Sequence, residues 1–410
     1  MIDENNIVIP RFLEKLFIYS FAFFMFFNFL DRSISNIFLI FLLLASLIIL
    51  IKSNYYDEID KKIFFFVTLL VFLFLLLNIH HHQPHHVHSV IHEMNNYSRY
   101  LLLLPVYFAA KRIKISIETF FNIIIYSSII AFLLLIYDTY FLGFNNYDNE
   151  RYKGTASSII TYGNLIMSLA ILLLCNIFRQ LPRKICIKSL ILFMLMIFTW
   201  SATITKGSLI GFLLGFICVL FLYKRYFISF IIASLLFIIL FSTNIHVHIK
   251  NAFNAYQTIE LNIIKDNTKE NSSINERIYY IKYSIKKIIE NPFIGIGPGE
   301  YYKQMRESLK NEKIDLVPRD HAHNEFLDIT AKYGIVTLIS FLLLHAYLIR
   351  VFLKYKNEYT NIGIIFIITQ FGFMLTQSQF AHHQAIAFFI LILFILLGST
   401  CRISMNLDKG

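Results

Sequence analysis

The residues best suited to chemistry stand in a polar stretch just before a long apolar run. His323 and Asn324 come first, and Gly334 follows after nine intervening residues. Histidine exchanges its proton near neutral pH, so it is a common general base for a hydroxyl group. We expect a short helix to begin near His323, where the helix dipole favours a bound anion and a neutral imidazole. The stretch therefore predicts a neutral histidine beside an anionic substrate, which is the state that a general base requires.

Neighbouring polar residues offer alternatives for the same chemistry. His321 lies two residues earlier and is a second candidate for the base. Asn324 is expected to shape the start of the helix or to orient the acceptor substrate. A carboxylate often orients a catalytic histidine, and three carboxylates stand close by: Asp320, Glu325 and Asp328.

Basic residues that suit a phosphate occur in three other segments. Arg277 follows the capping-box pattern Ser273-Ile-Asn-Glu276, which predicts an amphipathic helix with isoleucines at helical spacing up to Ile289. Lys206 stands in Thr203-Ile-Thr-Lys-Gly207, and Arg151 stands in an outer loop. Fixed cations stabilise the charge that develops on a phosphate leaving group. These three residues are therefore the candidates for binding an anionic donor.

A glycine-rich turn, Phe293-Ile-Gly-Ile-Gly-Pro-Gly299, follows the Asn291-Pro292 pair that should end the first helix. Backbone N–H groups in such a turn can approach a phosphate. The turn is not a Walker loop, because no Gly-Lys-Ser/Thr follows, and its spacing is not GxGxxG. On its own it is a weak indication of phosphate binding.

Together these segments resemble those of the bacterial O-antigen ligases. His323-Asn324, nine residues and Gly334-Ile-Val-Thr337 are similar to the family signature H-[NSQ]-x9-G-x-x-[GTY]. The stretch from Arg277 to Gly299 is similar to the segment that precedes this signature in ligases and related polymerases. The resemblance covers residues 150–400, whereas the first 150 residues resemble the family only in their hydropathy profile. Family members commonly have arginine where this chain has Lys206, which keeps the charge but lacks the bidentate fork.

The resemblance implies a membrane glycosyltransferase with a GT-C-like fold. Such a ligase transfers a glycan from undecaprenyl pyrophosphate to a lipid A–core acceptor on the periplasmic face, with no metal, nucleotide sugar or other cofactor. His323 would be the base, and Arg277, Lys206 and Arg151 would hold the pyrophosphate. An O-antigen polymerase and a protein O-oligosaccharyltransferase use the same class of donor. A transporter of lipid-linked glycans is the alternative from another functional class.

Composition indicates the setting in which these residues act. The chain has 410 residues, of which 57% are hydrophobic and only 15% charged, whereas soluble proteins are about 25% charged. This small number of charged residues could not cover the surface of a soluble fold of this size. Apolar side chains on the protein surface must therefore face lipid. The net charge of +11 falls in short clusters between apolar runs, which argues against a nucleic-acid-binding stripe. Composition therefore predicts an integral membrane protein, and the resemblance implies that its membrane is the bacterial inner membrane.

The apolar runs predict an all-α polytopic fold of about twelve membrane spans. The expected spans are 16–30, 34–51, 63–80, 98–110, 117–137, 158–178, 185–202, 207–223, 226–242, 334–353, 361–377 and 384–400. Basic residues concentrate in every second loop, which places both termini in the cytoplasm. Three regions follow: spans one to nine in 1–242, a periplasmic loop with the catalytic motif in 243–333, and the last three spans with a cytoplasmic tail in 334–410.

One further pattern is a histidine-rich tract from His80 to His92 at an outer membrane boundary. Such tracts can bind metal. This one has no spaced carboxylate or cysteine partners, and Pro84 breaks helical pairing of the histidines. We interpret it as a polar loop and expect no metal site.

Overall fold

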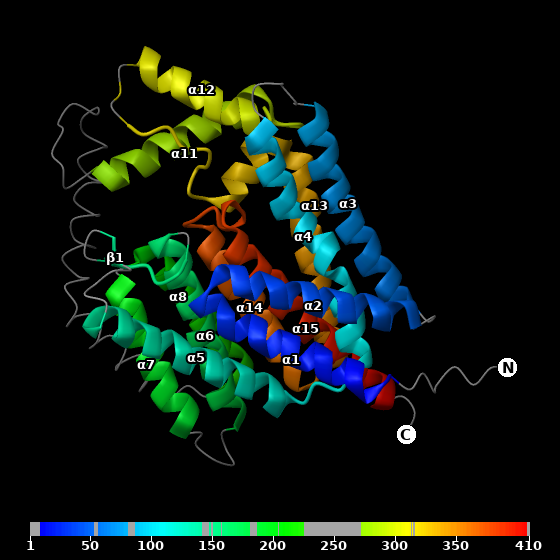
Figure 1. Cartoon of the computed structure of the whole chain (residues 1–410). Helices are drawn as coiled ribbons and strands as arrows, with labels where there is room; N and C mark the ends of the chain where they lie inside the picture. The colour runs from blue at the N-terminus through cyan, green and yellow to red at the C-terminus, as the bar shows by residue number, and fades with distance from the viewer. Residues whose placement is uncertain are drawn as a thin grey trace.

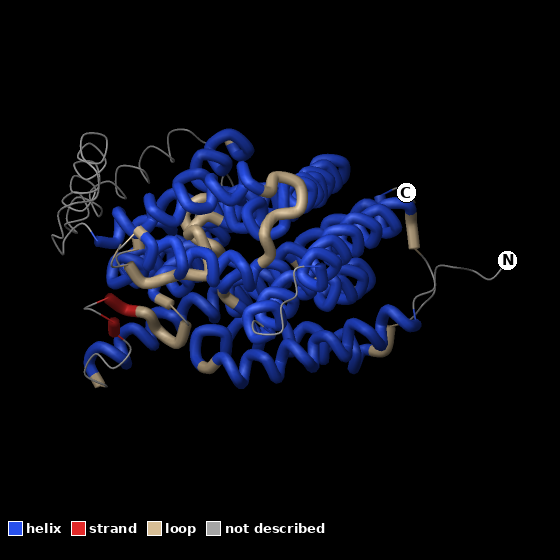
Figure 2. Tube along the Cα trace, turned by 90° about the horizontal axis from the view of Figure 1, so that it is seen from above, coloured by secondary structure: helices blue, strands red, loops and turns tan. Residues whose placement is uncertain are grey.

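The computed structural model describes residues 9–52, 56–80, 87–141, 147–148, 151–156, 158–180, 187–203, 205–224, 272–312, 314 and 316–407. These residues form a bundle that is almost entirely α-helical (Figure 1; Figure 2). The histidines of the tract from His80 to His92 lie outside the described side chains, and the expected span 226–242 lies outside the described residues altogether.

Seven described helices are long and apolar enough to cross a membrane. They are α1 (Arg11–Leu30), α2 (Arg32–Lys52), α5 (Ile117–Tyr140), α6 (Ile159–Gln180), α8 (Lys206–Tyr223), α13 (Glu325–Tyr355) and residues 383–402 of α15 (His383–Leu407). The remaining helices at expected spans are α3 (Glu58–His80), α4 (Val87–Arg112), α7 (Ile187–Thr203) and α14 (Glu358–Met374). The chain is thus an all-α polytopic membrane protein in its main architecture, while the count of twelve spans stays a prediction.

Two helices form the centre of the bundle. The apolar stretch of α15 is completely buried and that of α6 is 89% buried, whereas only 28% of the stretch in α2 is covered. A helix that is apolar all round and buried all round must be enclosed by other helices. The more exposed helices, such as α2, consequently present large apolar side chains to the surroundings, as expected for contact with lipid.

The close packing of α8 against α14 positions part of the site. A Cβ atom on Gly372 would lie 2.5 Å from the Cα of Gly211, so only glycine permits this approach of the two backbones. At the end of the same contact, Gly207 packs against the side chain of Thr376. The first turn of α8 therefore lies beside the segment that follows α14.

Two amphipathic helices lie across one end of the bundle, over the start of α13 (Figure 1). The first, α11 (Ser272–Glu290), matches the helix predicted from the capping-box pattern. The second, α12 (Pro298–Asn311), was not predicted, although Pro298 at its first turn and the buried Tyr301, Met305 and Leu309 at helical spacing indicate it. Both helices bury their apolar faces in a shared cluster with α13.

The helix α13 is broken at Gly334, the residue at which the expected span 334–353 begins. Gly334 has φ +77°, a conformation that favours glycine, and separates a short helix from the long apolar one. A break leaves carbonyl groups without helical partners. Here the N–H groups of Ile296 and Gly297 donate to the carbonyl oxygens of Ala331 and Lys332. The glycine-rich turn thus closes the break.

One short β-ribbon departs from the all-α prediction. Strands β1 (Tyr147–Asp148) and β2 (Arg151–Tyr152) pair antiparallel between α5 and α6. The buried Tyr152 donates a hydrogen bond of 2.7 Å to Asp138 near the end of α5. The ribbon therefore ties Arg151 to the end of the helical bundle.

Candidate functional site

Asn324 anchors the start of α13 and the residue before it. As the N-cap of this helix, its side-chain oxygen accepts a hydrogen bond from the N–H of Leu327, at 3.1 Å. Its amide group donates to the backbone oxygen of Leu375, at 3.0 Å. His323, directly before this cap, has φ +55°. The cap thus holds His323 in an unusual backbone conformation, which for residues other than glycine is found mainly where surrounding contacts enforce it.

Three histidines gather around this point. The ring centroids of His321 and His323 are 4.4 Å apart, and that of His382 lies 6.4 Å from His321. The side chain of Gln377 connects two of them: its oxygen is 3.1 Å from Nδ1 of His323, and its nitrogen is 2.9 Å from Nε2 of His382. The segment after α14 therefore contributes to the site as directly as the loop before α13.

Burial keeps two of these histidines neutral. It lowers the pKa of His323 to about 3, with a smaller effect from the neighbouring His321. It likewise lowers the pKa of His321 to about 4, against an opposing effect of Asp320. A buried imidazole without a bound anion is strongly biased against the charged form. Both rings therefore have a free lone pair at neutral pH.

None of the three neighbouring carboxylates contacts the ring of His323 through a described hydrogen bond. Asp328 accepts the N–H of Ala322, at 2.7 Å, and Glu325 accepts from the hydroxyl of Tyr97 and the N–H of Phe380. Asp320 lies 3.4 Å from Nδ1 of His321. The described hydrogen bonds of Glu325 and Asp328 thus lead to other groups, and the orientation of His323 by a carboxylate stays a prediction. These groups hold the surrounding loops instead.

The residue that contacts His323 is Gln377, which the sequence analysis missed. A signal was present, since Gln377-Ser-Gln379 places three polar residues directly after an apolar run and shortly before His382. All three of these polar residues are buried. Buried polar side chains beside a membrane-spanning helix are costly unless they have partners, which makes them candidates for function.

The structure brings the three predicted cations together. Arg277 lies on α11, Lys206 begins α8, and Arg151 lies on β2, yet each of the two arginines interacts electrostatically with Lys206. Burial and the charge of Arg151 lower the pKa of Arg277. The charge of Arg277 in turn disfavours protonation of His323. The charges of the three cations thus act on one another and form one positive cluster, and that of Arg277 also acts on His323.

The cluster is held in part by backbone contacts. Nε of Arg151 donates to the backbone oxygen of Thr203, at 3.0 Å, just before Lys206 begins α8. Like charges at close range repel one another, so assembling three of them costs free energy that a bound anion would recover. The arrangement is therefore suited to a polyanionic ligand such as a pyrophosphate.

The glycine-rich turn does not add to this anion site. The N–H groups of Ile296 and Gly297 are already bonded to α13, so they are not available to a phosphate. The suggestion of a phosphate-binding turn at 293–299 is wrong for these two groups.

Among the described residues, no group of three histidine, cysteine or acidic side chains is arranged to hold a metal ion.

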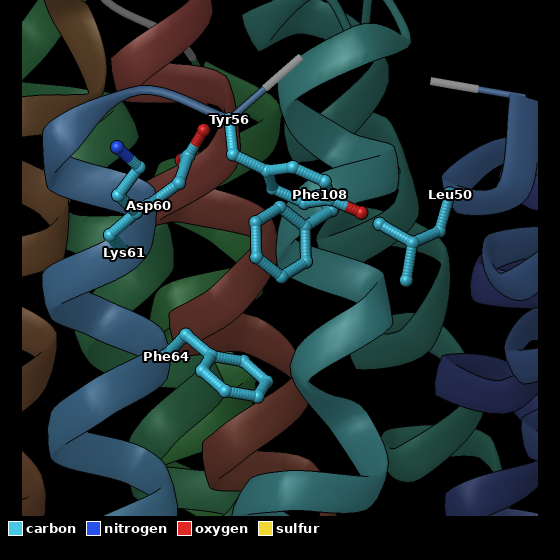
Figure 3. Close-up of a pocket in the computed structure, with 6 residues that line it drawn as sticks. All are labelled: Leu50, Tyr56, Asp60, Lys61, Phe64 and Phe108. Carbon is cyan, nitrogen blue, oxygen red and sulfur yellow. The ribbon is translucent and has the colours of Figure 1, made fainter. Parts of the chain in front are cut away.

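A separate apolar pocket of about 370 Å³ lies far from the histidines (Figure 3). Its lining includes Tyr56, Phe64 and Phe108, at the beginning of α3 and the end of α4. The opposite end of α3 approaches the site, where Phe74 packs on Tyr333 of α13. Since about 15–20 Å of α3 separate the pocket residues Asp60 and Phe64 from Phe74, we do not assign this pocket to the site.

Comparison with known proteins identifies one similar family and one similar protein. Residues 191–342 match the family model described as O-antigen ligase. Over this region the chain is similar to the O-antigen ligase family. The matched region of this chain includes Lys206, Arg277, His321 and His323, whereas Arg151 and Gln377 lie outside it. The match supports a glycosyltransferase-like membrane enzyme acting in O-antigen assembly.

The chain also resembles an uncharacterised protein of Haemophilus influenzae. The two are 25% identical over 316 residues, which cover 73% of this chain and 77% of the other. The similarity therefore extends well beyond the region that matches the family model.

Proposed function

We propose that this protein is an O-antigen ligase. It transfers a glycan from undecaprenyl pyrophosphate to the lipid A–core acceptor on the periplasmic face of the bacterial inner membrane, with both termini in the cytoplasm. The observation that carries the proposal is that Arg277, whose charge interacts with those of Lys206 and Arg151, also acts on a neutral His323. A pyrophosphate leaving group requires the cations, and a sugar hydroxyl nucleophile requires the base.

The reaction is a single displacement at the anomeric carbon of the glycan. The acceptor hydroxyl oxygen forms a bond to this carbon while the bond from the carbon to the pyrophosphate oxygen breaks. The hydroxyl proton passes to His323, and the electron pair of the broken bond leaves with undecaprenyl pyrophosphate. Arg277, Lys206 and Arg151 stabilise the negative charge that grows on this leaving group.

Binding of the donor also makes His323 a better base. Burial and, to a smaller extent, the charge of Arg277 lower the pKa of His323 to about 3. A pyrophosphate neutralises the cations and adds negative charge close to the ring, and both effects raise that pKa. His323 is thus a stronger base when the donor is bound, and it stays neutral before the donor binds.

The decisive experiment is reconstitution of the purified chain with an undecaprenyl-pyrophosphate-linked glycan and lipid A–core, in the presence of a chelator. Glycan on the core with the wild-type chain, and its loss with His323→Ala, would support the proposal. His321→Ala tests the alternative base, and Lys282→Ala, an exposed cation on α11, is the control. Longer lipid-linked chains would instead indicate a polymerase, and glycan on an added protein would indicate a protein oligosaccharyltransferase. Movement of intact donor across the bilayer without transfer would indicate a transporter.

A further inference from the structure

Gln377 lies between two imidazole rings, with each end of its side-chain amide facing a ring nitrogen. The oxygen is 3.1 Å from Nδ1 of His323, and the nitrogen is 2.9 Å from Nε2 of His382. An amide oxygen can only accept a hydrogen bond, and an amide NH₂ group can only donate. The ring atoms opposite must therefore have the complementary roles.

This chemistry assigns the protons on both histidines. Nδ1 of His323 must carry a hydrogen in order to donate to Gln377. Nε2 of His382 must lack one in order to accept from it. A neutral imidazole carries one ring hydrogen, so the lone pair of His323 lies on Nε2.

We infer that Gln377 is a positioning residue that fixes the tautomer of His323, with the proton on Nδ1 and the accepting lone pair on Nε2. The second step, that Nε2 takes the proton of the acceptor hydroxyl, rests on the proposed function. In many enzymes the tautomer of a catalytic histidine is set by a carboxylate on its other nitrogen. Here the side-chain amide of Gln377 takes the position of that carboxylate.

The backbone around Gln377 is held on both sides by the start of α13. Leu375 accepts a hydrogen bond from Asn324, and the N–H of Phe380 donates to Glu325. These two contacts flank Gln377, whose side chain is itself buried. The orientation of the amide relative to His323 is therefore fixed by the tertiary structure, which is what a positioning role requires.

A neutral amide suits the charges that face His323. The groups that act on its ring from the other elements are His321 and Arg319 in the preceding loop and Arg277 on α11. The ring of Tyr280 on α11 lies 6.0 Å away. A carboxylate at position 377 would favour the imidazolium before any substrate bound. The amide instead keeps the same hydrogen bond in the neutral and the protonated ring, so proton transfer requires no rearrangement around Nδ1.

The inference is tested by ¹⁵N NMR of histidine-labelled protein in lipid at pH 7, with the His323 signals identified from their loss in His323→Asn. We expect Nδ1 protonated and Nε2 bare in the wild-type chain, and a mixture of tautomers in Gln377→Leu. The control is Gln370→Leu, which removes another buried glutamine of the same region, bonded to Ser168, and should leave the His323 signals unchanged. A wild-type Nε2–H tautomer, or no change in Gln377→Leu, would overturn the inference.

Kinetics test the second step. Gln377→Leu should lower kcat about 10- to 100-fold with little change in KM for the donor, whereas Gln377→Glu, which matches the shape, should move the acidic limb of the kcat profile to higher pH. An unchanged kcat in Gln377→Leu despite a mixed tautomer would overturn this step alone. If no variant or wild-type chain transferred glycan, the proposed function would fail, while the NMR result would still decide the tautomer.

Discussion

The backbone oxygen of Phe293 occupies the space that a Cβ atom on Gly334 would need. This contact joins the glycine-rich turn to the break in α13, where Ile335 also donates its N–H to Pro292. The turn and the break are therefore one structural unit. Because α13 begins directly after Asn324, a shift of this unit would also shift His323.

Gly334→Ala should consequently displace the turn and the start of α13. The left-handed backbone at Gly334 adds a cost of about 1–3 kcal/mol for a residue with a side chain. We expect a lower thermal midpoint and loss of most transferase activity, measured in the reconstituted system. The control is Val336→Ala, two residues further on and half-exposed. Full activity and stability in Gly334→Ala would contradict the role of this unit.

Substitutions of Arg277 and Lys206 should show whether turnover depends on the positive charge or on the shape of the cationic group. Arg277→Ala should reduce turnover about 10²- to 10³-fold, because one charge-assisted contact to the leaving group is lost. Lys206→Arg should retain activity, since the longer side chain keeps the charge and adds a bidentate fork. Initial rates of glycan transfer at saturating acceptor are the measurement. Equal rates for Arg277→Ala and the surface control Lys282→Ala would remove Arg277 from the site.

Asn324 has two separable roles at the start of α13. Asn324→Asp keeps the oxygen that caps the helix but loses the amide that donates to Leu375, whereas Asn324→Ala loses both. We expect Asn324→Ala to cost about 1 kcal/mol or more in stability and Asn324→Asp to cost less. Both should lower activity, because both release the segment that carries Gln377. Thermal unfolding in detergent and transfer rates measure the two effects, and wild-type activity in Asn324→Asp would show that the bond to Leu375 is dispensable.

The buried histidines should make the protein sensitive to acid. The pKa values of His321 and His323 are about 4 and about 3 in the folded chain, below their usual value of 6.5. Between these values the unfolded chain binds more protons than the folded one, so stability falls as the pH drops from about 6.5 towards about 3. Thermal midpoints measured from pH 7 to pH 4.5 should show this decline.

The variant His321→Asn tests this prediction, because it removes one of the two imidazole rings whose protonation changes the stability. Its thermal midpoint should depend less steeply on pH than that of the wild-type chain over the same range. Identical slopes for the two proteins would mean that His321 is already charged, or already exposed, in the folded state.

Local patterns in the sequence determined the elements of this protein and several of their ends. Long apolar runs must become helices in a membrane because lipid offers no partners for backbone groups. The capping box before Arg277, the Asn-Pro pair after it and Gly334 each act within a few residues. Their effects on α11 and α13 could therefore be predicted without knowledge of the fold. The helix α12 has a local signal of the same kind, namely Pro298 in its first turn and apolar residues at helical spacing.

The tertiary structure decided which residues meet. Arg151, Lys206 and Arg277 come from segments far apart in the sequence, and only the packing of α8, α11 and the ribbon places their charges together. The same holds for Gln377, which reaches His323 because α13 anchors the segment after α14 on both sides. The glycine-rich turn was misjudged for the same reason, since its N–H groups bind carbonyls that the break in α13 exposes. Hydrogen-bond partners distant in the sequence leave no local pattern, so the orientation of the base is a property of the folded chain alone.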